Sequence, residues 1–381
     1  MNFNYCNTVK LFFGANVCEQ LKGILFEQQA NRILFITGEE KSRNVTSCIA
    51  EQMEEFDTKV LSGVTTNAKA ATILDMAQIS KEFNPDVIIT VGGGSVHDTG
   101  KAVSIMSKST DAALEDYTVN GKLSVPGIKD VIPLITIPTI VGSGAEVSPA
   151  ALVKIDNEKR VIFSPLLHPI ATIINIEYLK ELNKDILSRT AFDSFIQSIE
   201  GYLSTAANNI SDAFSEKAME YFIEYYSAIN NNDVNDDILE KLSIASIFSS
   251  YVCSTASVGA IHAISDPISG RFDIHHGKAL AMVAKRVLEK NIQHINEERL
   301  IKLDNILCGI NSFCEDVRLR VLEKIGVIID RLNILEKDSR IKCGAEIISS
   351  MIEESYNPDM AGNPHEFTHN EISEILKDWF E

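Results

Sequence analysis

The sequence lacks long apolar runs and an excess of basic residues, and each absence argues against a class of partner. No stretch of its 381 residues approaches the roughly 20 consecutive apolar residues of a membrane-spanning helix. The formal net charge is −18, and so acidic a surface repels nucleic-acid phosphates and anionic lipid headgroups. The first residues, "MNFNYCNTVKLFFGANVCEQ", show no basic start followed by an apolar run, so we expect no signal peptide.

Cysteine is sparse and follows no pattern. The seven cysteines are scattered, odd in number and free of any CxxC pair: Cys6, Cys18, Cys48, Cys253, Cys308, Cys314 and Cys343. This usage predicts reduced thiols in a cytoplasmic protein and excludes a zinc knuckle.

The first half of the chain alternates β-branched runs with helical stretches such as 67–83. Near-continuous apolar runs are typical of strands that are buried on both faces of a parallel sheet. The expected strands are 32–37, 59–64, 86–91, 131–137 and 171–176. Residues 1–182 are therefore predicted to form an α/β nucleotide-binding domain.

The pattern changes at about residue 183, where strand-like runs end and long amphipathic segments follow, from 186–204 to 370–380. Residues 183–381 are predicted to form an all-helical domain, interrupted by a polar loop at 230–237. The predicted fold class is thus an α/β N-terminal domain with a parallel dinucleotide-binding sheet, plus an all-α C-terminal domain.

Two glycine-rich turns each follow a predicted strand. The first, "GGGS", places Gly92, Gly93, Gly94 and Ser95 before a helix, where free N–H groups and close backbone approach suit a diphosphate. Its spacing is not the GxGxxG of the usual dinucleotide fold, and a flexible turn is the alternative. The second turn, "TIVGSG", brings Thr139, Gly142, Ser143 and Gly144 to the same sheet edge, which favours a phosphate-binding site.

The segment "DSFIQSIE" sets Asp193 and Gln197 four residues apart, on one face of a predicted helix. Such spacing offers two metal ligands, but an amide is a poor partner for a carboxylate in that role. The segment is either an ordinary polar stripe or a metal site with one altered ligand.

The two turns, read with "EKRVIFSP", "DSFIQSIEGY", "AIHAISDPISGRFDIHHGKALA" and "NPHEFTHNEI", resemble the iron-containing (group III) alcohol dehydrogenase family over essentially the whole chain. The resemblance implies a dehydroquinate synthase-like architecture and an NAD(P) site. The residues implied for cofactor binding are Gly38, Gly92, Gly93, Gly94, Ser95, Asp98, Thr139, Ser143 and Lys159. Gly38 stands where many members carry an Asp for the adenosine ribose, and Glu39 and Glu40 follow it, so NAD and NADP both stay open.

The resemblance also implies a divalent metal ion, Fe²⁺ or Zn²⁺, held by one Asp and three His. Asp193, His262 and His276 match three ligand positions, and Gln197 stands at the fourth. An amide oxygen is a weaker donor than imidazole, so the site is expected to be weakened or without an ion. Taken alone, each His would more often be a hydrogen-bonded core residue. Asp266 stands where many members have a further His.

The expected activity is NAD(P)-dependent hydride transfer between nicotinamide and a small alcohol or carbonyl substrate, with His262, Asp266 and His276 as catalytic candidates. One alternative is a specialised reductase of an anionic aldehyde such as phosphonoacetaldehyde. Another is a non-catalytic nucleotide-binding relative. The family also implies a homodimer.

Overall fold

The computed structural model describes residues 5–124, 127–310, 317–335 and 340–381. Residue contacts divide the chain into two units, Cys6–Glu181 and Leu182–Glu381, and Tyr5 groups with the second. The ring of Tyr5 lies against Phe214 and Tyr251, at centroid distances of 5.9 and 6.2 Å. The predicted boundary after residue 182 lies one residue from this division, whereas Tyr5, which the prediction placed in the N-terminal domain, groups with the helical unit.

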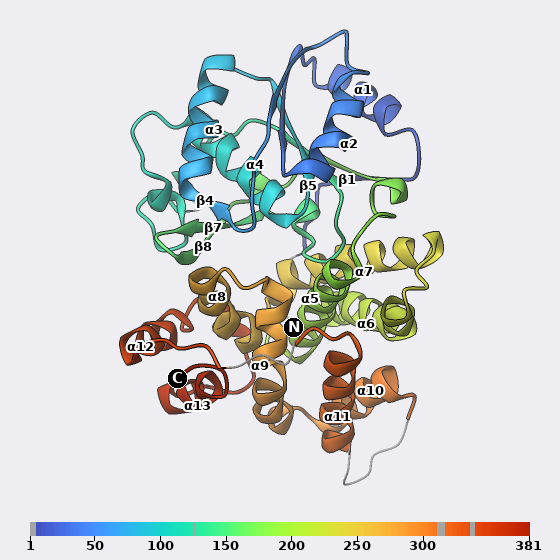
Figure 1. Ribbon diagram of the computed structural model, residues 1–381, viewed down its shortest axis with the longest axis vertical. Helices are drawn as coiled ribbons and strands as arrows, with labels where there is room; N and C mark the ends of the chain where they lie inside the picture. Colours follow the sequence, from blue (N-terminus) through green and yellow to red (C-terminus); the bar gives the residue numbers. More distant parts are fainter. Residues whose placement is uncertain (1–4, 125–126, 311–316, 336–339) are drawn as a thin grey trace. The chain divides into compact units, whose positions relative to one another are not determined.

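The N-terminal unit, coloured from blue to green in Figure 1, is built on a six-stranded sheet. Every pairing in this sheet is parallel, and the strand order is β1-β9-β6-β5-β2-β3. Its strands are β1 (Lys10–Phe13), β2 (Arg32–Thr37), β3 (Asp57–Leu61), β5 (Val87–Gly92), β6 (Leu134–Pro138) and β9 (Ala171–Ile174). The predicted parallel sheet is confirmed, with strand ends that move by a few residues and with β1 added at one edge.

Successive residues of β2 enter two different cores, as the pleat of a strand requires. Leu34 and Ile36 pack in a cluster with residues of α3 (Ala70–Phe83) and α4 (Gly94–Lys108). Ile33 and Phe35 pack with residues of α1 (Val17–Glu27) and α2 (Glu40–Ala50). Helices therefore cover both faces of the sheet, and this burial explains why the strands are apolar on both sides.

A second sheet of three strands escaped the sequence analysis. It contains β4 (Ala68–Lys69), β7 (Ala150–Ile155) and β8 (Glu158–Phe163), of which β7 and β8 form an antiparallel hairpin. The hairpin turns through Asp156 and Asn157, both with positive φ (50° and 74°), a backbone region that Asn and Asp tolerate better than most residues. The helix expected over 67–83 begins only at Ala70, because β4 pairs with β7.

The C-terminal unit is helical among the residues that the structure describes there, as predicted. Its α-helices are α5 (Lys184–Leu203), α6 (Asn209–Asn231), α7 (Asp236–Ala256), α8 (Ala260–Phe272), α9 (His276–Asn291), α10 (Glu297–Cys308), α11 (Val317–Arg331), α12 (Ala345–Glu354) and α13 (His369–Lys377). Asparagine side chains cap the N-termini of α5, α6, α7 and α10 by accepting backbone N–H groups. Helix α5 is buried along most of its length, so it forms the centre of this unit.

Helix α8 continues through Pro267, although proline usually breaks or kinks the interior of a helix. Proline lacks the N–H that would bond the carbonyl four residues earlier, here that of Ala263. The side-chain amide of Asn357 donates to that carbonyl (3.3 Å). This contact supplies a donor that the helix itself lacks at Pro267.

No single helix in the described ranges is long and apolar enough to cross a membrane. Helices α7 and α8 meet the criterion only as a pair bent by 109°, and most of their side chains are buried within the protein.

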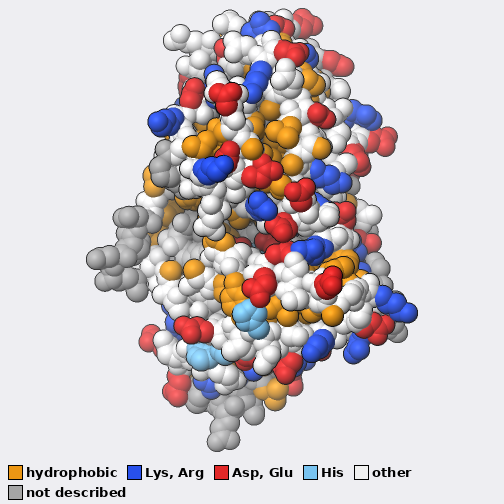
Figure 2. Space-filling model, turned by 90° about the vertical axis from the view of Figure 1, so that its left-hand side faces the viewer, with side chains coloured by type: hydrophobic (Ala, Val, Ile, Leu, Met, Phe, Trp, Pro, Cys, Tyr) orange, Lys and Arg blue, Asp and Glu red, His pale blue; other side chains and the backbone are white. Residues whose placement is uncertain are grey.

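Six cysteines are free thiols, and Cys314 lies outside the described residues. Figure 2 shows acidic and basic side chains interspersed on one face, without a continuous basic patch there.

Candidate active site

The glycine-rich turn lies where β5 ends and α4 begins. Gly93 is the N-cap of α4 and offers no side-chain hydrogen bond to the first turn of the helix. A Cβ atom on Gly92 would lie 2.5 Å from Val96 Cγ2, and one on Gly94 would lie 2.7 Å from Ser143 Oγ. Glycine therefore lets the second turn approach the first, and the backbone stays open at a helix N-terminus, the feature that suits a phosphate group.

The other predicted cofactor residues surround the same turn. Thr139 N donates to Gly92 O (2.9 Å), and the Ser95 hydroxyl accepts from the backbone N–H of Asn67 (3.1 Å). Gly38 directly follows β2, and a Cβ atom there would lie 3.4 Å from Val96 Cγ2. The structure thus brings both glycine-rich turns and Gly38 together at the carboxyl end of the parallel strands, where ligands bind such sheets.

Asp98 and Lys159 interact electrostatically beneath this turn. Burial raises the pKa of Asp98 to about 6, although Lys101, the backbone N–H of Leu152 and Lys159 all act to lower it. Asp98 therefore faces the β7–β8 hairpin, so its carboxyl group connects α4 to the second sheet.

Lys101, which the sequence analysis missed, holds the second turn in place. Its fully buried Nζ donates to the carbonyls of Ala145 and Ala150, both at 2.7 Å. Burial lowers the pKa of Lys101 to about 8, although Asp98 and Glu146 act to raise it. A lysine within the mostly apolar "KAVSIM" segment was the available signal, because lysine is rarely buried without partners.

His97 is a second buried basic group on α4. Its Nδ1 lies 2.8 Å from Thr90 Oγ1 within the sheet. Burial, helped by the positive charge of Lys101, lowers the pKa of His97 to about 3, so the ring is neutral. It packs as a core residue and takes no part in the proposed chemistry.

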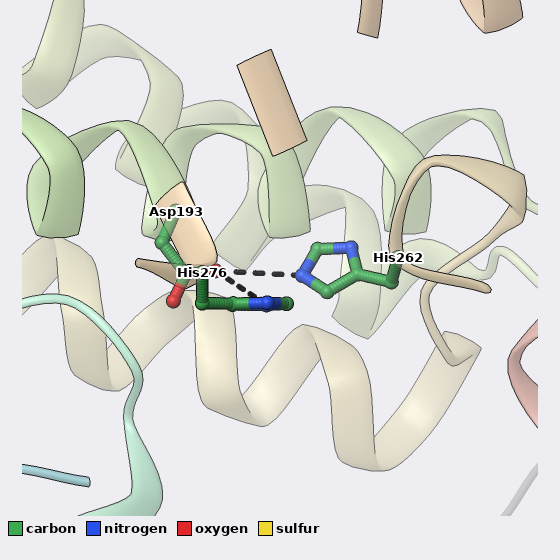
Figure 3. A group of neighbouring side chains, drawn as sticks. All are labelled: Asp193, His262 and His276. Atoms are coloured by element: carbon green, nitrogen blue, oxygen red, sulfur yellow. Dashed lines mark hydrogen bonds and ion pairs between the residues drawn. The ribbon is translucent and has the colours of Figure 1, made fainter. Parts of the chain in front are cut away.

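The metal candidates come together in the C-terminal unit, on three helices. Asp193 lies on α5, His262 on α8 and His276 at the first position of α9. One ligand atom from each lies within 4.8 Å of the others. The Nε2 atoms of His262 and His276 lie 3.4 and 3.9 Å from Asp193 Oδ1, and Figure 3 shows both rings directed toward that carboxylate.

These three residues fit a divalent cation. An ion with metal–ligand bonds of about 2 Å in tetrahedral geometry separates its ligand atoms by about 3.3 Å, close to the observed spacing. The pKa of Asp193 is lowered, because His276 and His262 outweigh the opposing effect of burial. Burial also disfavours the charged ring of His262, but hydrogen bonds to Asp193 and Glu200 raise its pKa to about 10.

Gln197 contacts the ligand Asp193 through its amide nitrogen, which donates to Asp193 Oδ1 (3.1 Å). Its amide oxygen accepts from the hydroxyl of Ser249 on α7 (2.8 Å). The oxygen, the only atom of the amide suited to an ion, is therefore directed to Ser249, and ligation by Gln197 stays a prediction. Ser249 was not foreseen from the sequence.

Asp266 and His275 both precede His276 in the sequence and have different roles around it. Asp266 Oδ1 lies 3.7 Å from His276 Nδ1, on the side of the ring opposite Asp193. His275 is the N-cap of α9, where its Nδ1 accepts from Gly277 N (3.3 Å). Asp266 is therefore placed to orient the His276 ring, whereas His275 helps to begin the helix.

The glycine-rich turn on a parallel sheet suits a nucleotide, and the carboxylate–histidine group in the helical unit suits a divalent cation. Residues 8–176 match the family model of iron-containing alcohol dehydrogenases, and residues 188–380 match that of the C-terminal domain of the same family. The chain belongs to the iron-containing alcohol dehydrogenase family. It is an oxidoreductase of the alcohol dehydrogenase type.

Curated relatives and solved structures agree with this assignment. The chain is 32% identical over 256 residues to 4-hydroxybutyrate dehydrogenase of Clostridium kluyveri, an alignment that covers 66% of each protein. It is 26% identical over 330 residues to alcohol dehydrogenase 4 of Schizosaccharomyces pombe, covering 83% of this chain and 74% of that one. An archaeal alcohol dehydrogenase from a Red Sea brine pool superposes with a TM-score of 0.90 at 21% identity, covering 99% of both chains. This structural similarity to the archaeal enzyme confirms the predicted fold.

Proposed function

We propose that the protein transfers hydride between NAD(P)H and a small carbonyl or alcohol substrate with the help of Fe²⁺ or Zn²⁺. The observation that carries the proposal is the convergence of Asp193 Oδ1 with the Nε2 atoms of His262 and His276. A carboxylate with two imidazoles is a donor set that both ions accept. The glycine-rich turn at α4 supports the nucleotide half of the reaction.

Each group then has a defined task. The backbone of Gly92 to Gly94 and the N-terminus of α4 bind the diphosphate, with Ser143 closing the second side. Asp193, His262 and His276 hold the ion, which when bound supplies a Lewis acid for the carbonyl oxygen. Asp266, whose Oδ1 lies 3.7 Å from His276 Nδ1, orients that ring.

A substrate that carries an anionic group is the second candidate. One relative of this chain, at 32% identity, is named for 4-hydroxybutyrate, whose chain ends in a carboxylate. Reduction of an anionic aldehyde, of which succinic semialdehyde and phosphonoacetaldehyde are examples, is therefore a specific form of the same proposal.

The experiment follows NAD(P)H absorbance with matched neutral and anionic aldehydes, using protein stripped by a chelator and then reloaded with Fe²⁺ or Zn²⁺. We expect turnover that depends on the ion, and the ratio of rates for butyraldehyde and succinic semialdehyde decides between the two substrate classes. Nucleotide binding without turnover of any aldehyde would indicate a non-catalytic relative. Absence of nucleotide binding would refute the proposal entirely.

A further inference from the structure

Glu200 is a buried carboxylate that no part of the proposed mechanism yet uses. It lies on α5, seven residues after Asp193 and therefore two turns along the same face of the helix. Both of its oxygens are engaged with α8: Oε1 accepts from Ile261 N (2.6 Å), and Oε2 lies 2.5 Å from His262 Nδ1.

The start of α8 explains the first contact. Its N-cap, Gly259, has no side chain to accept the free N–H groups of the first turn. Asn363 Oδ1 accepts from Ala260 N (3.0 Å), and Glu200 Oε1 accepts from the next N–H, that of Ile261. A Cβ atom on Gly259 would lie 2.8 Å from the Asn363 oxygen and 2.9 Å from Glu200 Oε1, so the glycine leaves room for both.

The contact between Glu200 Oε2 and His262 Nδ1 determines which ring nitrogen of His262 carries a hydrogen. An ionised carboxylate only accepts hydrogen bonds, so His262 Nδ1 must carry its hydrogen toward Glu200. The other nitrogen, Nε2, faces Asp193 at 3.4 Å and is the one that a metal ion would bind, in place of the hydrogen directed at Asp193 when no ion is bound. Partners of this kind fix the orientation and tautomer of histidine ligands in metal sites.

We propose that Glu200 is a positioning residue for the metal site, because it anchors the first turn of α8 and holds His262 in the tautomer that presents Nε2 to the ion. The inference rests on the proposed metal-dependent function. It assigns no contact between Glu200 and the substrate, the nucleotide or the ion.

The informative variant is Glu200→Gln, which keeps the size of the side chain and removes one acceptor. If the amide oxygen keeps its bond to Ile261 N, the amide NH₂ group faces His262 Nδ1 and favours the tautomer with hydrogen on Nε2, which cannot bind an ion. If the amide is turned the other way, its NH₂ group faces the backbone N–H of Ile261, and two donors then oppose each other. We expect Zn²⁺ affinity, measured by chelator competition, to fall by about 10–100-fold, with the helical circular dichroism spectrum unchanged.

The matched control is Glu354→Gln. Glu354 lies on α12 and forms an ion pair with Arg271, so this variant makes the same chemical change away from His262. It should leave Zn²⁺ affinity unchanged. A second measurement needs no variant at this position: ¹⁵N-histidine NMR of the Zn²⁺-loaded protein, assigned with His262→Gln, should show hydrogen on Nδ1 of His262.

The outcomes separate this inference from the function on which it rests. Wild-type protein that binds Zn²⁺ while Glu200→Gln binds it equally well would overturn the role of Glu200 and leave the metal site intact. NMR of the Zn²⁺-loaded wild type that shows no hydrogen on His262 Nδ1 would also overturn the role of Glu200. This test does not depend on whether Glu200→Gln folds. Wild-type protein without Zn²⁺ affinity would overturn the metal site itself, and with it the positioning role.

Discussion

Replacing Gln197 by histidine should restore a fourth ligand to the metal site. In the present structure the amide of Gln197 lies between Asp193 Oδ1 (3.1 Å) and Ser249 Oγ (2.8 Å). An imidazole on the same helical position extends about as far as the amide, so its outer nitrogen would lie beside the carboxylate. The Ser249 hydroxyl would then be available to accept from the inner nitrogen, which fixes the ring as Glu200 does for His262.

The expected magnitude follows from the ligands already present. Asp193, His262 and His276 supply one oxygen and two nitrogens, and a third imidazole completes a four-ligand set of the kind that binds Zn²⁺ tightly. Because loss of a supporting partner alone costs about 10–100-fold in affinity, gain of a direct ligand should tighten binding by at least about tenfold. This corresponds to about 1.4 kcal/mol.

Competition with a chromophoric chelator measures the change, on apo protein prepared identically for each variant. Gln197→Leu is the matched control, because it keeps the volume at this position, offers no ligand atom and should bind Zn²⁺ no better than wild type. A folded Gln197→His protein with wild-type Zn²⁺ affinity would refute the reasoning. Gln197 would then be better interpreted as a substrate-binding residue in a cavity that is not organised for an ion.

Three further predictions concern the nucleotide site, the domain boundary and pH. Gly93→Val should weaken NAD(P)H binding by at least about tenfold (about 1.4 kcal/mol) in fluorescence titrations, because a branched side chain enters the diphosphate path; unchanged affinity would remove the turn from the site. Limited proteolysis should cut first near 178–186, and cuts confined to 230–237 would instead indicate one inseparable unit. The depressed pKa of His97, from 6.5 to about 3, means that the unfolded chain binds a proton that the folded chain does not, so stability is lost as pH falls below 6.5. His97→Asn should abolish about 2 kcal/mol of that loss between pH 6.5 and about pH 5, and urea-unfolding curves with the wild-type pH dependence would contradict this.

The parallel sheet could be predicted from the sequence because burial on both faces leaves a direct compositional trace. Strand β5, for example, is buried at every position and polar only at Thr90, and it occurs in the six-stranded sheet as expected. Strand β8 leaves no such trace, because residues such as Glu158 and Arg160 are only half-buried and pair with each other at the surface. The turn residues of the β7–β8 hairpin, Asp156 and Asn157, were the signal available.

The proximity of Asp193, His262 and His276 could be expected from the family resemblance, whereas the contacts of their supporting residues could not. Asp193 and Gln197 are related by helical spacing, so their proximity follows from local structure. Ser249 and Glu200 act on residues 52 and 62 positions away in the chain, and these contacts exist only because α5, α7 and α8 pack together. A single sequence contains no periodicity that reports such packing.

The arrangement around Gln197 also bears on what a three-ligand site is able to do. Catalytic zinc sites typically use three protein ligands and keep one position open for water or substrate. Asp193, His262 and His276 offer three candidate ligand atoms, and Gln197 donates a hydrogen bond to the first of these residues. An amide at position 197 is therefore compatible with a metal ion that binds less tightly but retains an open position for a carbonyl oxygen. For this reason we expect the gain in Zn²⁺ affinity in Gln197→His without a matching gain in turnover, because affinity depends on the number of ligands and turnover depends on access to the ion.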